Sequence, residues 1–272
     1  MKNITSKQSN HVITVITVVK NDISNIKKTI ESAVDQNYPH IQYIVIDGSS
    51  TDGTLEIINK YKDKIDTIIS EPDGGIYDAM NKGLGLASGE LVLFLNSGDH
   101  LATSDVLSHV AKIYRENTGL GFIFGSIILN YSKLNIQKKI NREFTKQKMG
   151  RGQQPPHPAT FYKTSILHEH GGFDTQYVYS ADFDLFCRLI KKNYPCITID
   201  MPITFFQSGG ASAKLSAKIE TYMIIKNHFS FNLAIRYLAV KLIESTVKSI
   251  LRATGILAVL HHIKKFKLSG NH

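Results

Sequence analysis

The sequence predicts an α/β protein with a mostly parallel central sheet, flanked by helices and followed by a helical C-terminal tail. Apolar, β-branched segments alternate with helical patterns at short intervals over the first hundred residues, which is typical of βα units. The composition, 42% hydrophobic and 20% charged in 272 residues, is globular and excludes collagen, a coiled coil and wholesale disorder. After residue 212 the pattern is helical.

The alternating elements follow one another in order. Residues 11–19 (HVITVITVV) predict a buried first strand, and apolar residues at Ile26, Ile30 and Ala33 predict a helix over 23–34. The next elements are expected as strands at 41–46, 65–69 and 91–95 and as helices at 54–61 and 80–87.

The second half of the chain is less regular. Its expected elements are a strand at 122–129, a polar connection at 131–151, an amphipathic helix at 182–190, a strand at 197–199 and helix from 212 to about 266. The predicted organisation is a disordered N-terminus at 1–10, an α/β domain at 11–212 and a basic amphipathic helical tail at 213–272.

The net charge of +9 is concentrated in residues 213–272, which hold ten basic and two acidic side chains. The nearly neutral remainder argues against nucleic acid as a partner, whereas a basic, partly apolar tail suits an anionic surface. The tail either packs on the body or lies in an anionic headgroup layer. Its apolar stripe comprises Leu233, Val240, Val247 and Leu251, and its basic stripe comprises Lys241, Lys248 and Arg252.

The compartment follows from what the sequence lacks. The first ten residues show no secretory signal pattern, and no apolar window is long enough for a spanning helix, so we expect a cytoplasmic protein. Cys187 and Cys196 form no CxxC pair, which excludes a cysteine zinc site and a disulfide framework. We expect both to be reduced thiols.

Three aspartates, Asp22, Asp47 and Asp99, follow predicted strands. Ligands bind at the carboxyl ends of the strands in open α/β sheets, so we expect these side chains to gather at a site. Asp52, further along the loop after Asp47, is more simply a helix cap. Asp99 either ends a plain turn or holds a hard divalent cation, which needs few protein carboxylates.

Three further segments carry candidate residues. Asp182 starts an apolar-faced helix, where it either caps the helix or acts as a general base. His157 is flanked by prolines, and is either structural or presented into a cleft. The Gly/Ser-rich segment 207–212 either closes over a diphosphate with its backbone N–H groups or is a passive linker.

Five segments, taken in order, resemble family 2 inverting glycosyltransferases of the GT-A fold. They are ITVITVVKND, YIVIDGSSTDGT, EPDGGIYDAMNKGLGLASGELVLFLNSGD, PHPATFY and GGFDTQYVYSADFDLFCRL. The resemblance covers about residues 11–212 and is greatest to the branch that assembles bacterial O-antigen, colanic acid and capsule repeat units. It implies a nucleotide-diphosphate-sugar donor, with UDP as the expected nucleotide, and a divalent cation, Mn²⁺ or Mg²⁺.

The resemblance also implies the reaction and its place in the cell. The sugar is transferred with inversion to a hydroxyl of an undecaprenyl-diphosphate-linked saccharide, in the assembly of surface polysaccharide. Because such lipid acceptors reside in the inner leaflet, the enzyme is expected as a peripheral protein on the inner face of the cytoplasmic membrane.

The resemblance assigns roles to individual residues. Asp182 would be the catalytic base and Asp99 would hold the metal. The implied nucleotide-sugar contacts are Thr17 and Val19 at the base pocket, Asp47 at the nucleobase, Asp78, Asn81 and Lys82 near ribose or phosphate, and Asn96 at the ribose. His157 and Ser212 are candidates for contacts to the acceptor or to a phosphate.

Two positions depart from the family pattern. Many relatives have Asp-x-Asp where this chain has Asn96-Ser97-Gly98-Asp99, so Asn96 gives the metal no second charge and weaker metal binding is expected. The residue before the base, often Glu in relatives, is Ala181 here, which leaves acceptor contacts at that point open.

Two other functions compete with glycosyl transfer. A sugar nucleotidyltransferase generally needs a Gly-rich basic loop after the first strand, which Lys20-Asn21-Asp22 does not provide. The other is a non-catalytic carbohydrate-binding protein on the same fold. The presence of both Asp99 and Asp182 argues against it.

Overall fold

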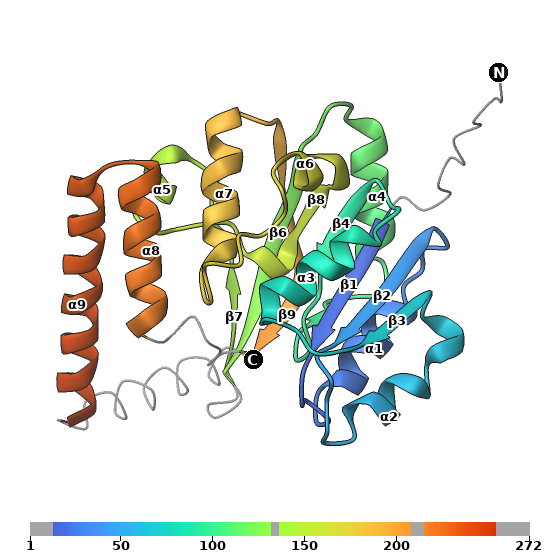
Figure 1. Ribbon diagram of the computed structural model, residues 1–272. Coiled ribbons are helices and arrows are strands. Elements are labelled where there is room, and N and C mark those ends of the chain that lie inside the picture. The colour runs from blue at the N-terminus through green and yellow to red at the C-terminus, as the bar shows by residue number, and fades with distance from the viewer. Residues whose placement is uncertain (1–12, 132–135, 208–214, 254–272) are drawn as a thin grey trace, which may run out of the picture.

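The structure is a computed structural model that describes residues 13–131, 136–207 and 215–253 (Figure 1). The described strands form one sheet in the order β3-β2-β1-β4-β8-β6-β9-β5, with β7 paired to β6. Its first half is parallel and comprises β1 (Ile13–Val19), β2 (Ile41–Asp47), β3 (Thr67–Ser70) and β4 (Leu91–Phe94). The predicted parallel βα units are confirmed in this half.

The second half of the sheet is mixed. It comprises β5 (His100–Leu101), β6 (Phe122–Tyr131), β7 (Ile136–Ile140), β8 (Thr160–Lys163) and β9 (Cys196–Gln207). The strand β8 lies antiparallel between β4 and β6, whereas β6 and β9 are parallel. The sheet is therefore less parallel beyond β4 than the alternation of the first hundred residues suggests.

Helices cover both faces of the sheet (Figure 1). They are α1 (Ile26–Val34), α2 (Thr54–Asn59), α3 (Ile76–Gly85), α4 (Val106–Glu116), α5 (Lys146–Met149), α6 (Thr164–Glu169), α7 (Ala181–Lys192), α8 (Leu215–His228) and α9 (Phe231–Ala253). Alternate residues of β1 enter two apolar cores, Ile16 in one and Val15 in the other. The first core includes side chains of α3, α7, α8 and α9, and the second includes side chains of α1, α2 and α4.

The C-terminal helices pack on the body. Ile224 and Ile225 of α8 and Ala234 and Tyr237 of α9 are buried in the first core. The rest of α9 runs along the outer edge of the molecule, and Ile243 is 63% exposed. The reading in which the tail packs on the body thus holds for one face of these helices, and the reading in which it lies on a membrane stays a prediction.

The predicted apolar stripe of the tail does not share one environment. Leu233 packs against the first core, whereas Val240 and Val247 are exposed. Within the described residues, no helix is both long and apolar enough to cross a bilayer. The predicted N-terminus at 1–10, Ser212 and the end of the predicted tail lie outside the described residues, and the boundary at 212–213 stays a prediction.

Several elements differ from the sequence-based expectation, and the tail expected as continuous helix is divided into α8 and α9. The helix Val106–Glu116 was not expected, and Ile136–Ile140 forms a hairpin strand inside the expected polar connection. The strand expected at 197–199 is longer and extends over Cys196–Gln207. Its pairing with β6 shifts in register near Pro202, so the proline disrupts the hydrogen-bond ladder locally and the strand continues beyond it. The thiols of Cys187 and Cys196 are free, as expected.

Candidate active site

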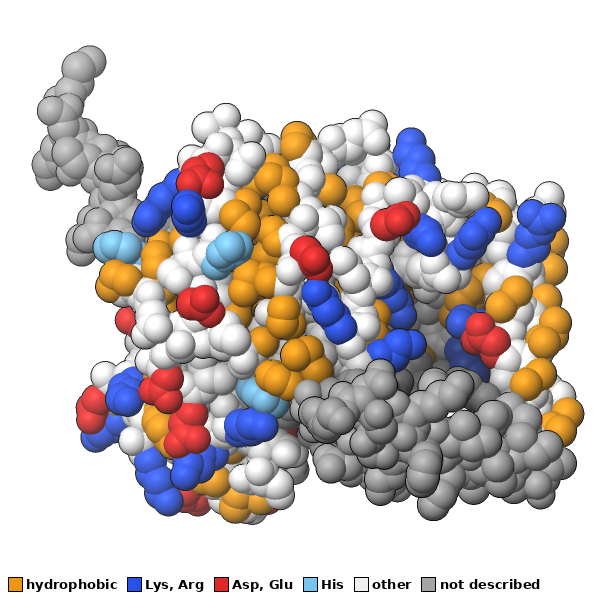
Figure 2. All heavy atoms as spheres, turned by 180° about the vertical axis from the view of Figure 1, so that it is seen from behind, with side chains coloured by type: hydrophobic (Ala, Val, Ile, Leu, Met, Phe, Trp, Pro, Cys, Tyr) orange, Lys and Arg blue, Asp and Glu red, His pale blue; other side chains and the backbone are white. Residues whose placement is uncertain are grey.

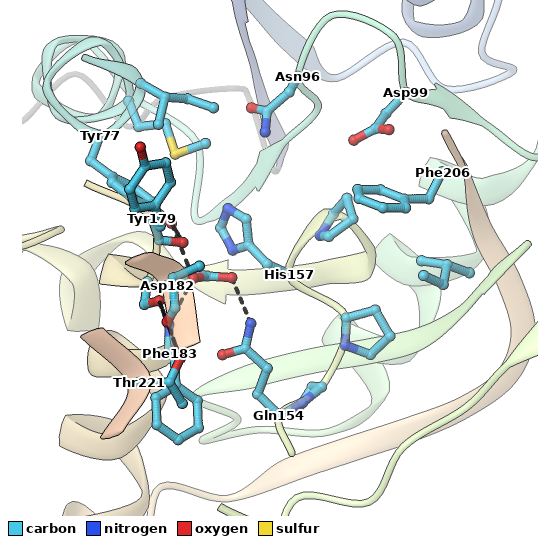
Figure 3. Close-up of a pocket in the computed structure, with 18 of the residues that line it drawn as sticks. Tyr77, Asn96, Asp99, Gln154, His157, Tyr179, Asp182, Phe183, Phe206 and Thr221 are labelled. Atoms are coloured by element: carbon cyan, nitrogen blue, oxygen red, sulfur yellow. Dashed lines mark hydrogen bonds between the residues drawn. The ribbon is translucent and has the colours of Figure 1, made fainter. Parts of the chain in front are cut away.

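A cleft of about 750 Å³ opens at the carboxyl ends of the parallel strands (Figure 3). Its sheet-edge wall consists of Asp22, after β1, and Asn96 and Asp99, after β4. Its helical wall consists of Tyr77 from α3, Gln154, Asp182 from α7 and Thr221 from α8. The cleft therefore joins loops of the parallel half of the sheet to helices from the second half of the chain.

The sheet-edge wall consists of polar side chains from two loops, and Asp22 Oδ1 accepts a hydrogen bond from Asn25 Nδ2 at 2.6 Å. The Ser97 hydroxyl donates to Asp22 Oδ2 at 2.6 Å, which ties the loop after β1 to the loop after β4. Asp99 is buried, and the turn before it places Gly98 in the left-handed region at φ +94°, where glycine is favoured. Asn96 Oδ1 is buried and has no hydrogen-bond partner in the described part of the chain. Asp22 and Asp99 thus lie at one site, as the strand pattern predicts, but Asp47, the third aspartate of that prediction, is fully buried and does not line the cleft.

The sheet-edge wall fits a hard divalent cation. Carboxylate and carboxamide oxygens are the ligands that Mg²⁺ prefers, and Asn96 Oδ1 is an acceptor for which the described protein supplies no donor. The described residues hold no group of three or more His, Cys, Asp or Glu side chains arranged for a metal. A cation here would therefore use Asp99, Asp22 and Asn96 and complete its shell with water and substrate phosphates.

Asp182 occupies the centre of the helical wall. It is the second residue of α7, and the cap position belongs to Ser180, so Asp182 is not the N-cap. Its carboxylate accepts hydrogen bonds from the Tyr77 hydroxyl at 3.1 Å, from the Phe183 backbone N–H at 2.9 Å and from Gln154 Nε2 at 2.5 Å. These three donors hold the Asp182 carboxylate in one orientation at the cleft.

His157 lies between the two walls in Figure 3. Its Nδ1 is 3.0 Å from the Tyr162 hydroxyl and its ring stacks on Phe94, whereas Nε2 is buried without a partner in the described residues. Burial lowers the pKa of His157, and the nearby Asp182 carboxylate opposes that shift only in part. The imidazole is therefore neutral at pH 7, and His157 lines the cleft.

Three predicted nucleotide contacts lie outside the cleft lining. Thr17 and Val19 are buried in β1, and the Thr17 hydroxyl is 3.1 Å from the Tyr43 hydroxyl. Asp47 is fully buried at the end of β2, where its carboxylate accepts hydrogen bonds from the hydroxyls of Ser50 and Ser70. Their roles in binding the base stay predictions.

The predicted residues of α3 brace neighbouring loops. Asp78 accepts from the Gly74 N–H at 2.9 Å, and Lys82 Nζ contacts Glu71 at 2.8 Å. Asn81 bonds both the N–H and the C=O of Phe173, at 2.9 and 2.8 Å. The cleft face of α3 carries Ile76, Tyr77 and Met80 instead. The assignments of Asp78, Asn81 and Lys82 to ribose or phosphate stay predictions.

Sequence reasoning missed two residues that contact Asp182. Tyr77 lies inside a motif that the resemblance covers, and its spacing of three from Met80 would have placed it on the same helix face. Gln154 lies in an aperiodic loop, and nothing in the sequence marks it. Two cationic side chains, Arg142 and Lys218, also line the cleft and were not predicted.

Comparison with known proteins identifies the family. Residues 14–171 match the family model described as Glycosyl transferase family 2. The chain belongs to glycosyl transferase family 2. The family relationship confirms the resemblance carried by the five sequence segments.

Two curated relatives cover most of the chain. One, an uncharacterized glycosyltransferase of Mycobacterium tuberculosis, is 30% identical over 205 residues, which span 74% of this chain and 77% of the relative. The other is the UDP-Glc:alpha-D-GlcNAc-diphosphoundecaprenol beta-1,3-glucosyltransferase WfaP of Escherichia coli. It is 27% identical over 210 residues, which span 74% of this chain and 80% of WfaP.

Solved structures share the fold. The S. aureus protein TarS, residues 1–349 in complex with UDP, matches with a TM-score of 0.63 at 18% identity, over 83% of this chain and 70% of that TarS chain. The mannosyltransferase PcManGT of Pyrobaculum calidifontis, in complex with GDP-Man and Mn²⁺, matches with a TM-score of 0.62 at 17% identity. The match covers 92% of this chain and 80% of the PcManGT chain. The predicted GT-A fold is thereby confirmed.

Proposed function

We propose that this glycosyltransferase moves a sugar from a nucleotide-diphosphate sugar, with UDP as the nucleotide, to a hydroxyl of a lipid-linked saccharide with inversion. The observation that carries the proposal is a single cleft lined both by the Asp182 carboxylate, which three donors hold, and by the polar side chains of the sheet-edge wall. The names of WfaP and of the TarS complex, both of which contain UDP, support the choice of nucleotide.

Asp182 is proposed as the general base. An ionised carboxylate takes the proton of the acceptor hydroxyl as that oxygen attacks the anomeric carbon, on the side opposite the leaving nucleoside diphosphate. A new C–O bond to the acceptor forms while the C–O bond to the phosphate breaks, and the electron pair leaves with the diphosphate. One displacement of this kind inverts the anomeric centre.

The sheet-edge wall is proposed to hold the diphosphate end of the donor. Asp99, Asp22 and Asn96 would hold the Mn²⁺ or Mg²⁺ ion, which compensates the negative charge that grows on the leaving diphosphate. The neutral His157 imidazole sits between the two walls, where Nε2 is placed to hydrogen-bond either the acceptor or a phosphate. The Mn²⁺ in the PcManGT complex supports a divalent cation.

The acceptor is proposed to be an undecaprenyl-diphosphate-linked saccharide used in assembly of O-antigen or capsule. The acceptor named for WfaP supports this choice. We further propose that the exposed face of α9 docks the enzyme on the inner surface of the cytoplasmic membrane. Apolar side chains line the edge of the molecule that α9 forms (Figure 2), within a segment that carries most of the net positive charge.

The donor is tested by hydrolysis and transfer assays. UDP-, GDP- and dTDP-sugars are incubated with Mn²⁺ or Mg²⁺, first alone and then with α-D-GlcNAc diphosphate on a lipid chain. We expect release of UDP and a saccharide lengthened by one sugar. Release of pyrophosphate would identify a nucleotidyltransferase, and binding of saccharide without turnover of any donor would identify a non-catalytic binding protein.

A further inference from the structure

Gln154 lines the cleft, and the two ends of its carboxamide differ in their partners (Figure 3). Its Nε2 donates to Asp182 Oδ2 at 2.5 Å, so this half of the carboxamide is used within the protein. Its Oε1 is buried and has no hydrogen-bond partner in the described residues. A buried acceptor without a donor is unfavourable, so this atom is better satisfied when a ligand fills the cleft.

Oε1 of Gln154 is an acceptor, so its partner in a complex would be a hydrogen-bond donor close to Asp182. An ionised Asp182 only accepts, and the hydroxyl whose proton it removes is itself supplied by the acceptor sugar. A saccharide carries further hydroxyls on adjacent ring carbons, and each of them can donate. The adjoining amide oxygen and carboxylate therefore match two neighbouring hydroxyls of one sugar ring.

We propose that Gln154 binds the acceptor saccharide: Oε1 accepts a hydrogen bond from a hydroxyl next to the one that Asp182 deprotonates, while Nε2 holds the carboxylate in orientation. The inference rests on the proposed function, because it assigns to Gln154 the choice of which acceptor hydroxyl faces the base. Gln154 is thus both a positioning residue for Asp182 and a specificity residue for the acceptor.

Glutamine is the side chain that this double role requires. Glutamate would bring a second negative charge against Asp182, and alanine would remove both the donor and the acceptor. The backbone of Gln154 is also held, because its carbonyl accepts from Arg142 Nη1 at 3.5 Å. The neighbouring Gln153 is exposed and does not line the cleft, so it provides a matched control.

The test combines enzyme variants with altered acceptors. Gln154→Ala, Gln154→Glu and the control Gln153→Ala are assayed with the UDP-sugar that the donor assay selects and with α-D-GlcNAc diphosphate on a lipid chain. The acceptor is also made with each hydroxyl that does not receive the sugar removed in turn. For Gln154→Ala we expect an acceptor KM about tenfold higher, a lower kcat and an unchanged KM for the UDP-sugar, with a greater loss in Gln154→Glu.

The decisive measurement compares how much activity wild type and Gln154→Ala each lose when one acceptor hydroxyl is removed. Removal of one particular hydroxyl should cost the wild-type enzyme about tenfold and cost Gln154→Ala almost nothing more, because the contact is already absent. Equal losses in wild type and Gln154→Ala for every altered acceptor would overturn the inference, as would an unchanged acceptor KM. Absence of transfer by the wild-type enzyme from every nucleotide sugar in the donor assay would instead contradict the proposed function itself.

Discussion

The two walls of the cleft are built in different ways. The sheet-edge wall consists of loops that leave parallel strands, so the strand pattern itself places Asp22 and Asp99. The helical wall is assembled from α3, α7, α8 and a loop, and hydrogen bonds between distant segments set its geometry. In the proposed function, the sheet-edge wall faces the diphosphate, which all nucleotide-sugar donors share. The helical wall faces the acceptor, which varies between enzymes.

The largest expected effect tests whether the walls act separately. Asp182→Asn should reduce transfer at least ~10²-fold, because the amide has nearly the shape of the carboxylate but cannot take the acceptor proton. Calorimetry with UDP and Mn²⁺ should show nearly unchanged nucleotide affinity. The control is Asp200→Asn, at an exposed site in β9. A variant that keeps half of the wild-type transfer would remove Asp182 from this role.

The reciprocal change addresses the sheet-edge wall. Asp99→Ala should weaken UDP binding in the presence of Mn²⁺ at least about tenfold, because the proposed cation loses a charged ligand. Without metal, wild type and variant should bind UDP equally, and the control Asp63→Ala should match wild type in both conditions. Equal UDP affinity of wild type and Asp99→Ala with Mn²⁺ present would contradict this role.

A third prediction concerns the outer face of α9. Full-length protein should co-sediment with vesicles that contain phosphatidylglycerol, and high salt should reverse this binding only in part, because apolar side chains stay inserted. Replacement of the exposed Ile243 and Ile250 by Glu should lower the vesicle affinity about tenfold or more.

The control for the α9 variant replaces two exposed serines of the same helix. Ser245→Glu with Ser249→Glu adds the same charge without removing apolar surface, and should reduce vesicle binding less. Point variants are preferable to truncation at residue 228, since Ala234 and Tyr237 belong to the core. Equal sedimentation with and without phosphatidylglycerol would show that α9 is a packing element only.

The smallest effect is expected at Tyr77. Tyr77→Phe removes a hydroxyl that donates to Asp182 but leaves the packed ring, so kcat should fall about threefold to fivefold, with the donor KM unchanged. Tyr61→Phe removes a similar bond to Glu31 at 2.8 Å outside the cleft and should not change kcat. Equal rates for the two variants would mean that the three-donor arrangement around Asp182 is not needed.

The sequence predicts the sheet-edge wall better than the helical wall for a physical reason. A buried strand is a continuous apolar run, so its end, and with it Asp99, can be located from the sequence. The helical wall depends on where α3 begins. The structure starts this helix at Ile76, four residues before the expected start, and this places Tyr77 on the cleft face. Gln154 belongs to a loop with no periodic pattern, so only the tertiary structure reveals its contact with Asp182.

The contact between Gly152 and Tyr237 constrains how this enzyme can be recombined with its relatives. A β-carbon at Gly152 would lie 2.4 Å from the Tyr237 ring, so the loop that carries Gln154 runs directly against α9. The C-terminal helices are therefore not an exchangeable module. A chimera that takes its last forty residues from another family member would replace most of α9 and change the packing against the loop that carries Gln154. We expect its acceptor preference to change even though the rest of the chain is kept.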